Sequence, residues 1–261
     1  MYKPIQPHHL LSQEFPEKIK YTETVIPELS DVLVYMWESE YYPDVTSTFL
    51  ETYLADGCMA LVVSVVDKSI VWGGFSQTFF DMEEPVYEKY LAFKFKPGAF
   101  YAMTGTPTSL IMDVMTPIDQ IDKNFDTVSF FEKDYEQMKA FLTSYLIKLA
   151  TNIKSTEYIE LFDRINDKHT QNTKELYDFI KLSPRQVQRQ FKNHYGLTPQ
   201  MILSIIKFQH CVAELLHERS NRTDLSNLYY DQSKFTNEFK KHLGITPVEF
   251  VNLNKMRKAS L

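Results

Sequence analysis

Apolar and polar positions follow two different periods along this chain of 261 residues. In the first half, short runs rich in β-branched and aromatic residues are separated by turn residues, which predicts strands. The run at 32–37 fits a buried strand or a short helix, because periodicity alone does not separate the two. The first half is therefore predicted to be a β-rich domain, either a barrel or a sandwich. The predicted strands cover residues 19–25, 32–37, 46–53, 59–66, 70–72, 76–80 and 87–95.

Turn residues and charges lie between these runs. Asp56-Gly57 and Asp67-Lys68 predict tight turns, and the acidic stretch 81–85 is interpreted as a turn between two strands. Residues 1–18 are expected to form a loosely held arm.

The period changes near Val128. Apolar residues then recur at steps of three and four, which predicts one amphipathic helix of about five turns. Its apolar face could pack on the domain core or form the seam of a homodimer through 128–150, and both interpretations stay open. The apolar positions are Phe131, Tyr135, Met138, Phe141, Leu142, Tyr145, Leu146 and Leu149.

Helix start and stop signals follow one another in the last hundred residues. Asn172 with Glu175, and Ser183 with Gln186, have the spacing of capping pairs, and Gly196 is a stop signal. The remainder of the chain is therefore predicted to be all helical. The predicted helices cover 158–165, 174–180, 184–195, 199–217, 222–229 and 232–243, with a last helix from 247.

One stretch of this helical part is written twice. Residues 191–199 read FKNHYGLTP and residues 239–247 read FKKHLGITP, with six of nine positions identical at an offset of 48 residues. Self-similarity at such a period indicates one supersecondary unit used twice.

The helix of the first copy has two faces. Val187, Phe191 and Tyr195 form an apolar stripe, and the opposite face carries charged and amide side chains. Arginine can donate two hydrogen bonds to guanine, and glutamine can pair with adenine, in a major groove. This face predicts a DNA-reading helix that follows a first helix at 174–180 in a helix-turn-helix. The predicted DNA-binding residues are Arg185, Gln186, Gln188, Arg189 and Lys192.

The corresponding face of the second copy is less cationic. It can still contact phosphates and bases, but with a smaller electrostatic contribution, so the first helix is expected to carry more affinity and specificity. The predicted DNA-binding residues of this copy are Gln232, Ser233, Lys234, Thr236, Asn237 and Lys240.

Two helix-turn-helix units joined by a long helix, each ending in F-K-x-x-x-G-x-T-P, resemble the DNA-binding domain of AraC-type bacterial transcription regulators. The resemblance covers about 172–254 and implies that both reading helices enter successive major grooves. The chain departs from the family in two places. Lys181 stands where the first turn usually has glycine, and the second turn, 225–229, is shortened.

The first half resembles the N-terminal domain of a subset of AraC-like regulators. The resemblance lies in the stretches 35–37, 54–57, 93–99 and 105–107. We therefore expect two domains, a β-rich sensory or dimerisation domain over 1–165 and a double helix-turn-helix domain over 166–261. Their charges differ: residues 1–165 contain 13 Lys and Arg and 25 Asp and Glu, whereas residues 166–261 contain 15 and 9. The basic half is a candidate for polyanions.

Enzymatic motifs were sought and not found. No nucleophile, nucleotide-binding or metal-ligand pattern appears, so neither catalysis, a cofactor nor a metal is expected. Cys58 and Cys211 lie far apart and are interpreted as small buried hydrophobes in a reducing interior. No apolar run is long enough for a membrane span, and the start lacks the features of a signal peptide, so a cytoplasmic protein is expected.

The sequence thus predicts a transcription regulator that binds double-stranded DNA. A small-molecule effector, RNA polymerase and a second copy of the chain are the other expected partners, and whether it activates or represses stays open. The alternative is a degenerate regulator that acts through protein contacts and binds DNA weakly. An enzymatic β-rich half is a third interpretation, which no motif supports.

Overall fold

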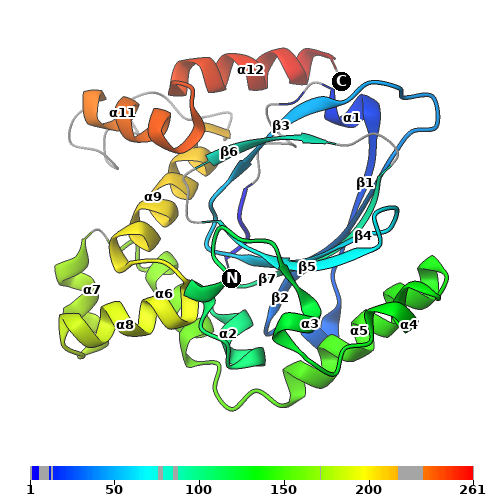
Figure 1. The fold of residues 1–261 in the computed structure, drawn as a ribbon. Helices are drawn as coiled ribbons and strands as arrows, with labels where there is room; N and C mark the ends of the chain where they lie inside the picture. The colour runs from blue at the N-terminus through cyan, green and yellow to red at the C-terminus, as the bar shows by residue number, and fades with distance from the viewer. Residues whose placement is uncertain are drawn as a thin grey trace.

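The computed structural model describes residues 2–5, 12, 14–75, 79–84, 88–170, 172–216 and 232–260. Strands occupy the first half of the chain and helices the second (Figure 1). The expected order of a β-rich part, added helices and an all-helical part is confirmed.

The strands form two antiparallel sheets. The larger sheet has six strands in the order β1-β2-β7-β4-β5-β8, and β3 and β6 form a separate two-stranded sheet. The stretch 32–37, for which strand and helix were both open, lies in a strand. The strands are β1 (Ile19–Thr24), β2 (Leu33–Tyr41), β3 (Phe49–Leu54), β4 (Met59–Ser64), β5 (Ser69–Gly73), β6 (Phe79–Glu84), β7 (Lys89–Phe95) and β8 (Thr116–Pro117).

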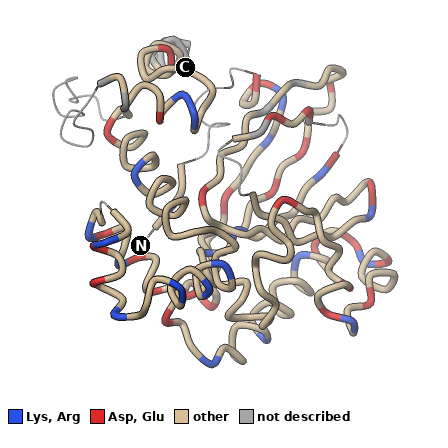
Figure 2. Tube along the Cα trace, turned by 60° about the vertical axis from the view of Figure 1, so that its left-hand side comes forward, with Lys and Arg blue, Asp and Glu red and all other residues tan. Residues whose placement is uncertain are grey.

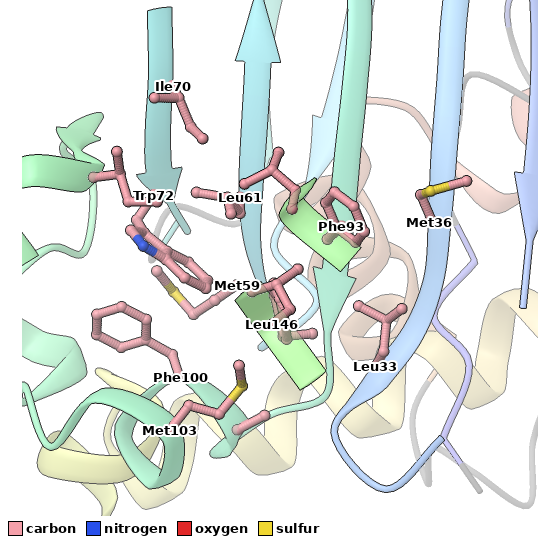
Figure 3. Close-up of a cluster of buried hydrophobic side chains, with 14 of the residues drawn as sticks. Leu33, Met36, Met59, Leu61, Ile70, Trp72, Phe93, Phe100, Met103 and Leu146 are labelled. Carbon is pink, nitrogen blue, oxygen red and sulfur yellow. The ribbon is translucent and has the colours of Figure 1, made fainter. Parts of the chain in front are cut away.

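One face of the larger sheet is covered by helices. Alternate residues of a strand point to the same face, and Leu61, Phe93 and Trp72 from neighbouring strands are all buried in one cluster. Phe100 and Leu146 come from helices and meet the same cluster (Figure 3). The core of the β-rich part therefore lies between this face and the helices. These helices are α2 (Ala99–Thr104), α3 (Ile118–Ile121), α4 (Thr127–Phe131) and α5 (Tyr135–Thr151), with the short 3-10 turns η2 (Pro27–Leu29) and η3 (Thr108–Leu110).

The acidic stretch was wrongly interpreted as a turn. Residues 81–84 belong to β6, where Thr52 of β3 lies opposite Asp81. The Thr52 hydroxyl donates a hydrogen bond to the Asp81 carboxylate over 2.6 Å. Exposed acidic side chains suit a two-stranded ribbon with water on one side, which the turn interpretation overlooked.

The predicted helix of about five turns is present as α5, but it begins later than expected, because Phe131 lies in the separate α4. Asp134 accepts a hydrogen bond from the backbone of Gln137, and the Gln137 side chain accepts one from the backbone N–H of Asp134, so a capping box starts a second helix there. Met138, Leu142 and Leu146 of α5 are buried in the sheet core. The apolar face is thus used inside the domain, which favours the core interpretation over the seam.

The first residues are not a loose arm where the structure describes them. Tyr2 is 4% exposed, and its hydroxyl donates to the Asp56 carbonyl over 2.9 Å. The backbone N–H of Tyr2 donates to the Asp163 carboxylate over 2.8 Å. The segment 2–5 is therefore held between the β-rich part and the helices. A short helix, α1 (Phe15–Lys18), precedes β1.

Helices form the rest of the described chain. Leu161, Phe162 and Ile165 of α6 share a buried cluster with α7, α8 and the first part of α9, whereas Phe208 and Val212 of α9 share another with α11 and α12. None of the described helices is long and apolar enough to cross a membrane. The helices are α6 (Glu157–Asp167), α7 (Thr173–Ile180), α8 (Pro184–Tyr195), α9 (Pro199–Leu216), α11 (Gln232–Leu243) and α12 (Pro247–Ser260).

Candidate nucleic-acid interface

Helix α8 begins where the sequence predicted. The Ser183 hydroxyl accepts from the Gln186 N–H, and the Gln186 amide oxygen accepts from the Ser183 N–H over 3.0 Å, so the capping box is complete. Pro184 occupies the first turn, where its missing N–H costs no hydrogen bond. Gln186 is exposed, but its side chain serves this cap. Its contact with DNA stays a prediction.

The two faces of α8 are separated as the pattern predicted. Val187, Phe191 and Tyr195 are each at most 1% exposed and fill the helical core. The opposite face is exposed, and the cations on it form no ion pair with any residue that the structure describes. A continuous polar and cationic surface is therefore available to a ligand. Its exposed members are Arg185, Gln188, Arg189 and Lys192.

Helix α11 repeats this division with a smaller net positive charge, because Glu238 offsets one of its three lysines. Phe235, Phe239 and Leu243 are buried against α9 and α12. Ser233, Asn237 and Lys240 are exposed, and Thr236 is half-buried. The predicted contacts of Gln232 and Lys234, the cap at Asp231 and the short helix at 222–229 lie outside the described residues or side chains.

The turn between α7 and α8 forms without glycine. Lys181 ends α7 in the left-handed region, with φ 59° and ψ 30°, and its N–H donates to the Tyr177 carbonyl over 3.0 Å. Such a backbone costs a non-glycine residue roughly 1–2 kcal/mol. The departure noted in the sequence therefore strains the first turn while leaving its geometry in place.

The two candidate reading helices lie at opposite ends of α9 (Figure 1). Helix α9 has 18 residues, which corresponds to about 27 Å at 1.5 Å per residue. Its first part packs with α8 and its second part with α11. One continuous helix therefore fixes the separation of the two exposed faces.

The C-terminal end of α8 contacts the β-rich part. The Thr108 hydroxyl of η3 donates to the His194 carbonyl over 2.9 Å. The Tyr195 hydroxyl donates to the Tyr158 carbonyl of α6 over 2.6 Å. At Gly196, a Cβ atom would lie 2.4 Å from Met112 and 3.2 Å from Thr108. In the sequence, Gly196 signals only the end of a helix, because a contact with a segment almost ninety residues away has no local signal.

The second copy contacts the β-rich part at the corresponding glycine. A Cβ atom on Gly244 would lie 3.2 Å from the Phe79 ring of β6. In α9, the Gln209 amide exchanges two hydrogen bonds with the backbone of Ile5, over 2.7 and 3.2 Å. Both units are thus attached to the first half of the chain.

Other chemistry in the described residues is structural. Cys58 and Cys211 are buried, and burial raises the pKa of the Cys58 thiol. Lys94 forms a buried ion pair with Asp56, which raises the pKa of Lys94 against the opposing effect of burial. No group of three or more potential metal ligands lies among the described residues.

The positions of Lys and Arg on the helices, and of Asp and Glu on the strands, can be followed in Figure 2.

Two family models match the chain. Residues 176–253 match a helix-turn-helix domain, and residues 26–117 match a domain of unknown function (DUF6597). The first match spans α7 to α12, and the second spans η2 to β8. No curated protein matches the chain in sequence.

Solved structures with a similar course of the chain include ToxT from Vibrio cholerae. One, at 1.65 Å resolution, is 10% identical, covers 90% of this chain and 98% of its own, and has a TM-score of 0.40. A second, of ToxT with a bound unsaturated fatty acid, is 11% identical, covers 81% and 97%, and has a TM-score of 0.38.

Proposed function

We propose, from the AraC-type helix-turn-helix domain that this chain carries over residues 176–253, that the protein is a sequence-specific DNA-binding transcription regulator. Regulators of this type are not enzymes, in agreement with the expectation from sequence. The observation that supports the proposal most strongly is the exposed face of α8. This face carries three cations and an amide, and it lies on the opposite side of the helix from the buried apolar stripe.

In this proposal α8 is the principal reader. Arg185 and Arg189 are spaced one helical turn apart, so both guanidinium groups can address neighbouring base pairs in one major groove. Lys192 lies one turn farther, where a point charge suits a phosphate. Each good bidentate base contact discriminates by about 1–3 kcal/mol. Helix α7 would then cross the backbone beside the groove.

Helix α11 is the secondary reader. Its exposed described side chains are Ser233, Asn237 and two lysines, so their contacts release fewer counterions from DNA than the three cations of α8. Helix α9 separates the readers by about 27 Å, which is of the order of the 34 Å or so between successive major grooves on one side of DNA. Both helices can therefore address one side of the same duplex after a modest bend or tilt.

Control through the N-terminal part is the second element of the proposal. The hydrogen bond of Thr108 with the end of α8 and the packing of Phe79 on the second unit join the β-rich part to both readers. A ligand that alters the conformation of the β-rich part would therefore alter the positions of α8 and α11. The proposal also includes the division into domains at 165/166, a small-molecule effector and a homodimer. It further includes a contact with RNA polymerase, activation of transcription and a cytoplasmic location.

Selection of bound duplexes from a random pool tests the function. We expect one enriched sequence with two motifs about one helical turn apart, and loss of retention for Arg189→Ala. Failure to enrich any sequence at low salt, together with no effect of Arg189→Ala, would favour the alternative of a regulator that acts through protein contacts. Sedimentation of the full chain, alone and with the duplex, tests the homodimer.

A further inference from the structure

The two copies of the repeat share one histidine. His194 and His242 occupy the same place, three residues after the shared phenylalanine and two before the shared glycine. Each therefore lies in the last turn of a recognition helix. Histidine is the side chain whose unperturbed pKa lies closest to neutrality, so this shared position is chemically different from the others.

His194 is enclosed by aromatic rings. Its ring stacks on Tyr158 of α6, with centroids 3.6 Å apart and an interplanar angle of 11°. Tyr101 of α2 meets it edge-on at 4.4 Å. The His194 Nδ1 atom is buried and has no hydrogen-bond partner among the described residues. The ring thus packs the end of α8 against two other helices, at the place where Thr108 also holds the backbone.

His242 has an equivalent position in the second unit. It is 2% exposed, and its ring stacks on Phe208 of α9 at 4.7 Å with an angle of 14°. Its Nε2 atom lies 2.8 Å from the Ser204 hydroxyl of α9. This ring therefore fixes the end of α11 against the helix that joins the two units.

Both environments favour the neutral ring. Burial lowers the pKa of His194 to about 4, and burial together with the neighbouring Lys241 lowers that of His242 to about 4. The groups shown to face His194 are the phenol rings of Tyr101, Tyr158 and Tyr195, and no acidic group contributes to either shift. The effect is expected to be larger at His242, which is 2% exposed beside Phe208, Ser204 and the cationic Lys241, than at the half-buried His194.

We propose that His194 and His242 are paired positioning residues, whose neutral rings fix the last turn of each recognition helix and whose protonation releases both readers together. The consequence for DNA rests on the proposed function, whereas the effect on helix packing does not. The direction follows from linkage. A histidine held neutral in the folded state contributes stability above its unfolded pKa of about 6.5, and that contribution falls as the pH decreases toward 4.

The expected size is measurable. A full shift from about 6.5 to about 4 changes the folding equilibrium about thirtyfold per histidine at pH 5. The contribution of His194 is smaller, because its ring is partly exposed and solvent screens its charge. Between pH 8 and 5 the full chain should therefore lose helix packing and DNA affinity over the same range.

Two variants remove the titration and retain the packing. His194→Phe keeps a ring on Tyr158 and removes the unpaired nitrogen, and His242→Gln keeps a polar group within reach of Ser204. Urea unfolding gives the folding equilibrium constant of each variant, and fluorescence anisotropy gives its association constant for the selected duplex. The readout for each variant is the ratio of this constant at pH 8 to the same constant at pH 5.5. We expect the ratio to fall about tenfold in the double variant relative to the unaltered chain.

The proposal would be overturned if the unaltered chain and the double variant lost the same amount of stability between pH 8 and pH 5.5. Tyr158→Phe and Tyr158→Leu form a matched pair: the first keeps the stack and should leave the ratio unaltered, and the second should reduce it. If a variant does not fold, histidine resonances of the unaltered chain followed by NMR decide, because values near 6.5 for both rings contradict the proposal. Unfolding and NMR need no DNA, so the absence of DNA binding would refute the proposed function alone.

Discussion

The two copies of the repeat have the same scaffold and differ in what they present and in how they are held. Helices α8 and α11 both bury an apolar stripe and end at a glycine in the left-handed region, with φ 72° at Gly196 and 77° at Gly244. The first is tied to the preceding part of the chain by hydrogen bonds from Thr108 and Tyr195, whereas at Gly244 the second meets the Phe79 ring. The residues that are identical in the two copies are therefore those that the fold requires.

The exposed faces show the opposite pattern, because the copies hardly agree there. The first face carries Arg185, Arg189 and Lys192, and the described side chains of the second include Ser233 and Asn237 with two exposed cations, Lys240 and Lys241. Folding does not require these side chains to match, since they do not contribute to the helical core. Under the proposed function, this divergence gives each helix a different surface for reading DNA.

The largest expected difference between the copies is at the closing glycines. Gly196→Ala should destabilise the fold by about 3 kcal/mol, because a left-handed alanine costs roughly 1–2 kcal/mol and the methyl group also meets Met112 and Thr108. Gly244→Ala should cost about 1–2 kcal/mol, since the methyl group only approaches the Phe79 ring. Urea unfolding of the full chain measures both.

A matched variant separates the two causes at Gly196. Met112→Ala in the Gly196→Ala background removes the nearest atoms and should recover part of the loss that exceeds the cost of the backbone. Equal losses at Gly196 and Gly244 would show that the contact with η3 does not distinguish the first copy.

The next effect concerns DNA. Arg189→Ala should weaken binding to the selected duplex by about 2 kcal/mol and relax the preference for one base pair, because a bidentate contact is lost. Asn237→Ala should weaken it by less, since the second reader contributes fewer charges. Anisotropy titrations at several salt concentrations measure both the affinity and the number of cations released.

Lys168→Ala is a control for general electrostatics. This lysine is exposed on the segment after α6 and lies over the Phe179 ring of α7 at 4.1 Å, so it is not part of α8. A loss equal to that of Arg189→Ala would mean that overall charge, and not the face of α8, determines affinity. An Asn237→Ala effect larger than that of Arg189→Ala would reverse the assigned order of the readers.

Local signals predicted the helical part well. Ser183 with Gln186 and the closing Gly196 each determine an end of a helix through contacts within a few residues, so sequence spacing is sufficient. Interactions over long distances were not predictable in this way. The burial of Tyr2 depends on Asp56 and Asp163, and the break before Asp134 depends on the competition between a capping box and a continuous apolar stripe.

The candidate site was predictable to the extent that it depends on one helix. The face with Arg185, Gln188 and Arg189 follows from the period of α8 alone. The enclosure of His194 by Tyr101 and Tyr158 does not, because these rings come from two other helices. A histidine shared by both copies was the signal in the sequence, but it has meaning only once its surroundings are known.

The smallest expected effect is at the first turn, where Lys181 takes a left-handed backbone conformation. Lys181→Gly should stabilise the fold by about 1 kcal/mol, because the gain from relieving a left-handed lysine exceeds the entropy that glycine adds to the unfolded chain. Lys181→Asn should give a smaller gain, and Lys181→Ala none, since alanine has the same steric penalty. The midpoint and slope of urea unfolding measure the series.

The same series bears on the comparison of the two units. If Lys181→Gly raises stability and leaves the affinity for the selected duplex unchanged, the missing glycine weakens the fold of the first unit and not its reading face. The lysine at this turn then gives no reason to regard the first unit as degenerate. If Lys181→Gly instead strengthens binding more than it stabilises the fold, the strained turn displaces α8 from its best position, and the first unit is less clearly the stronger reader.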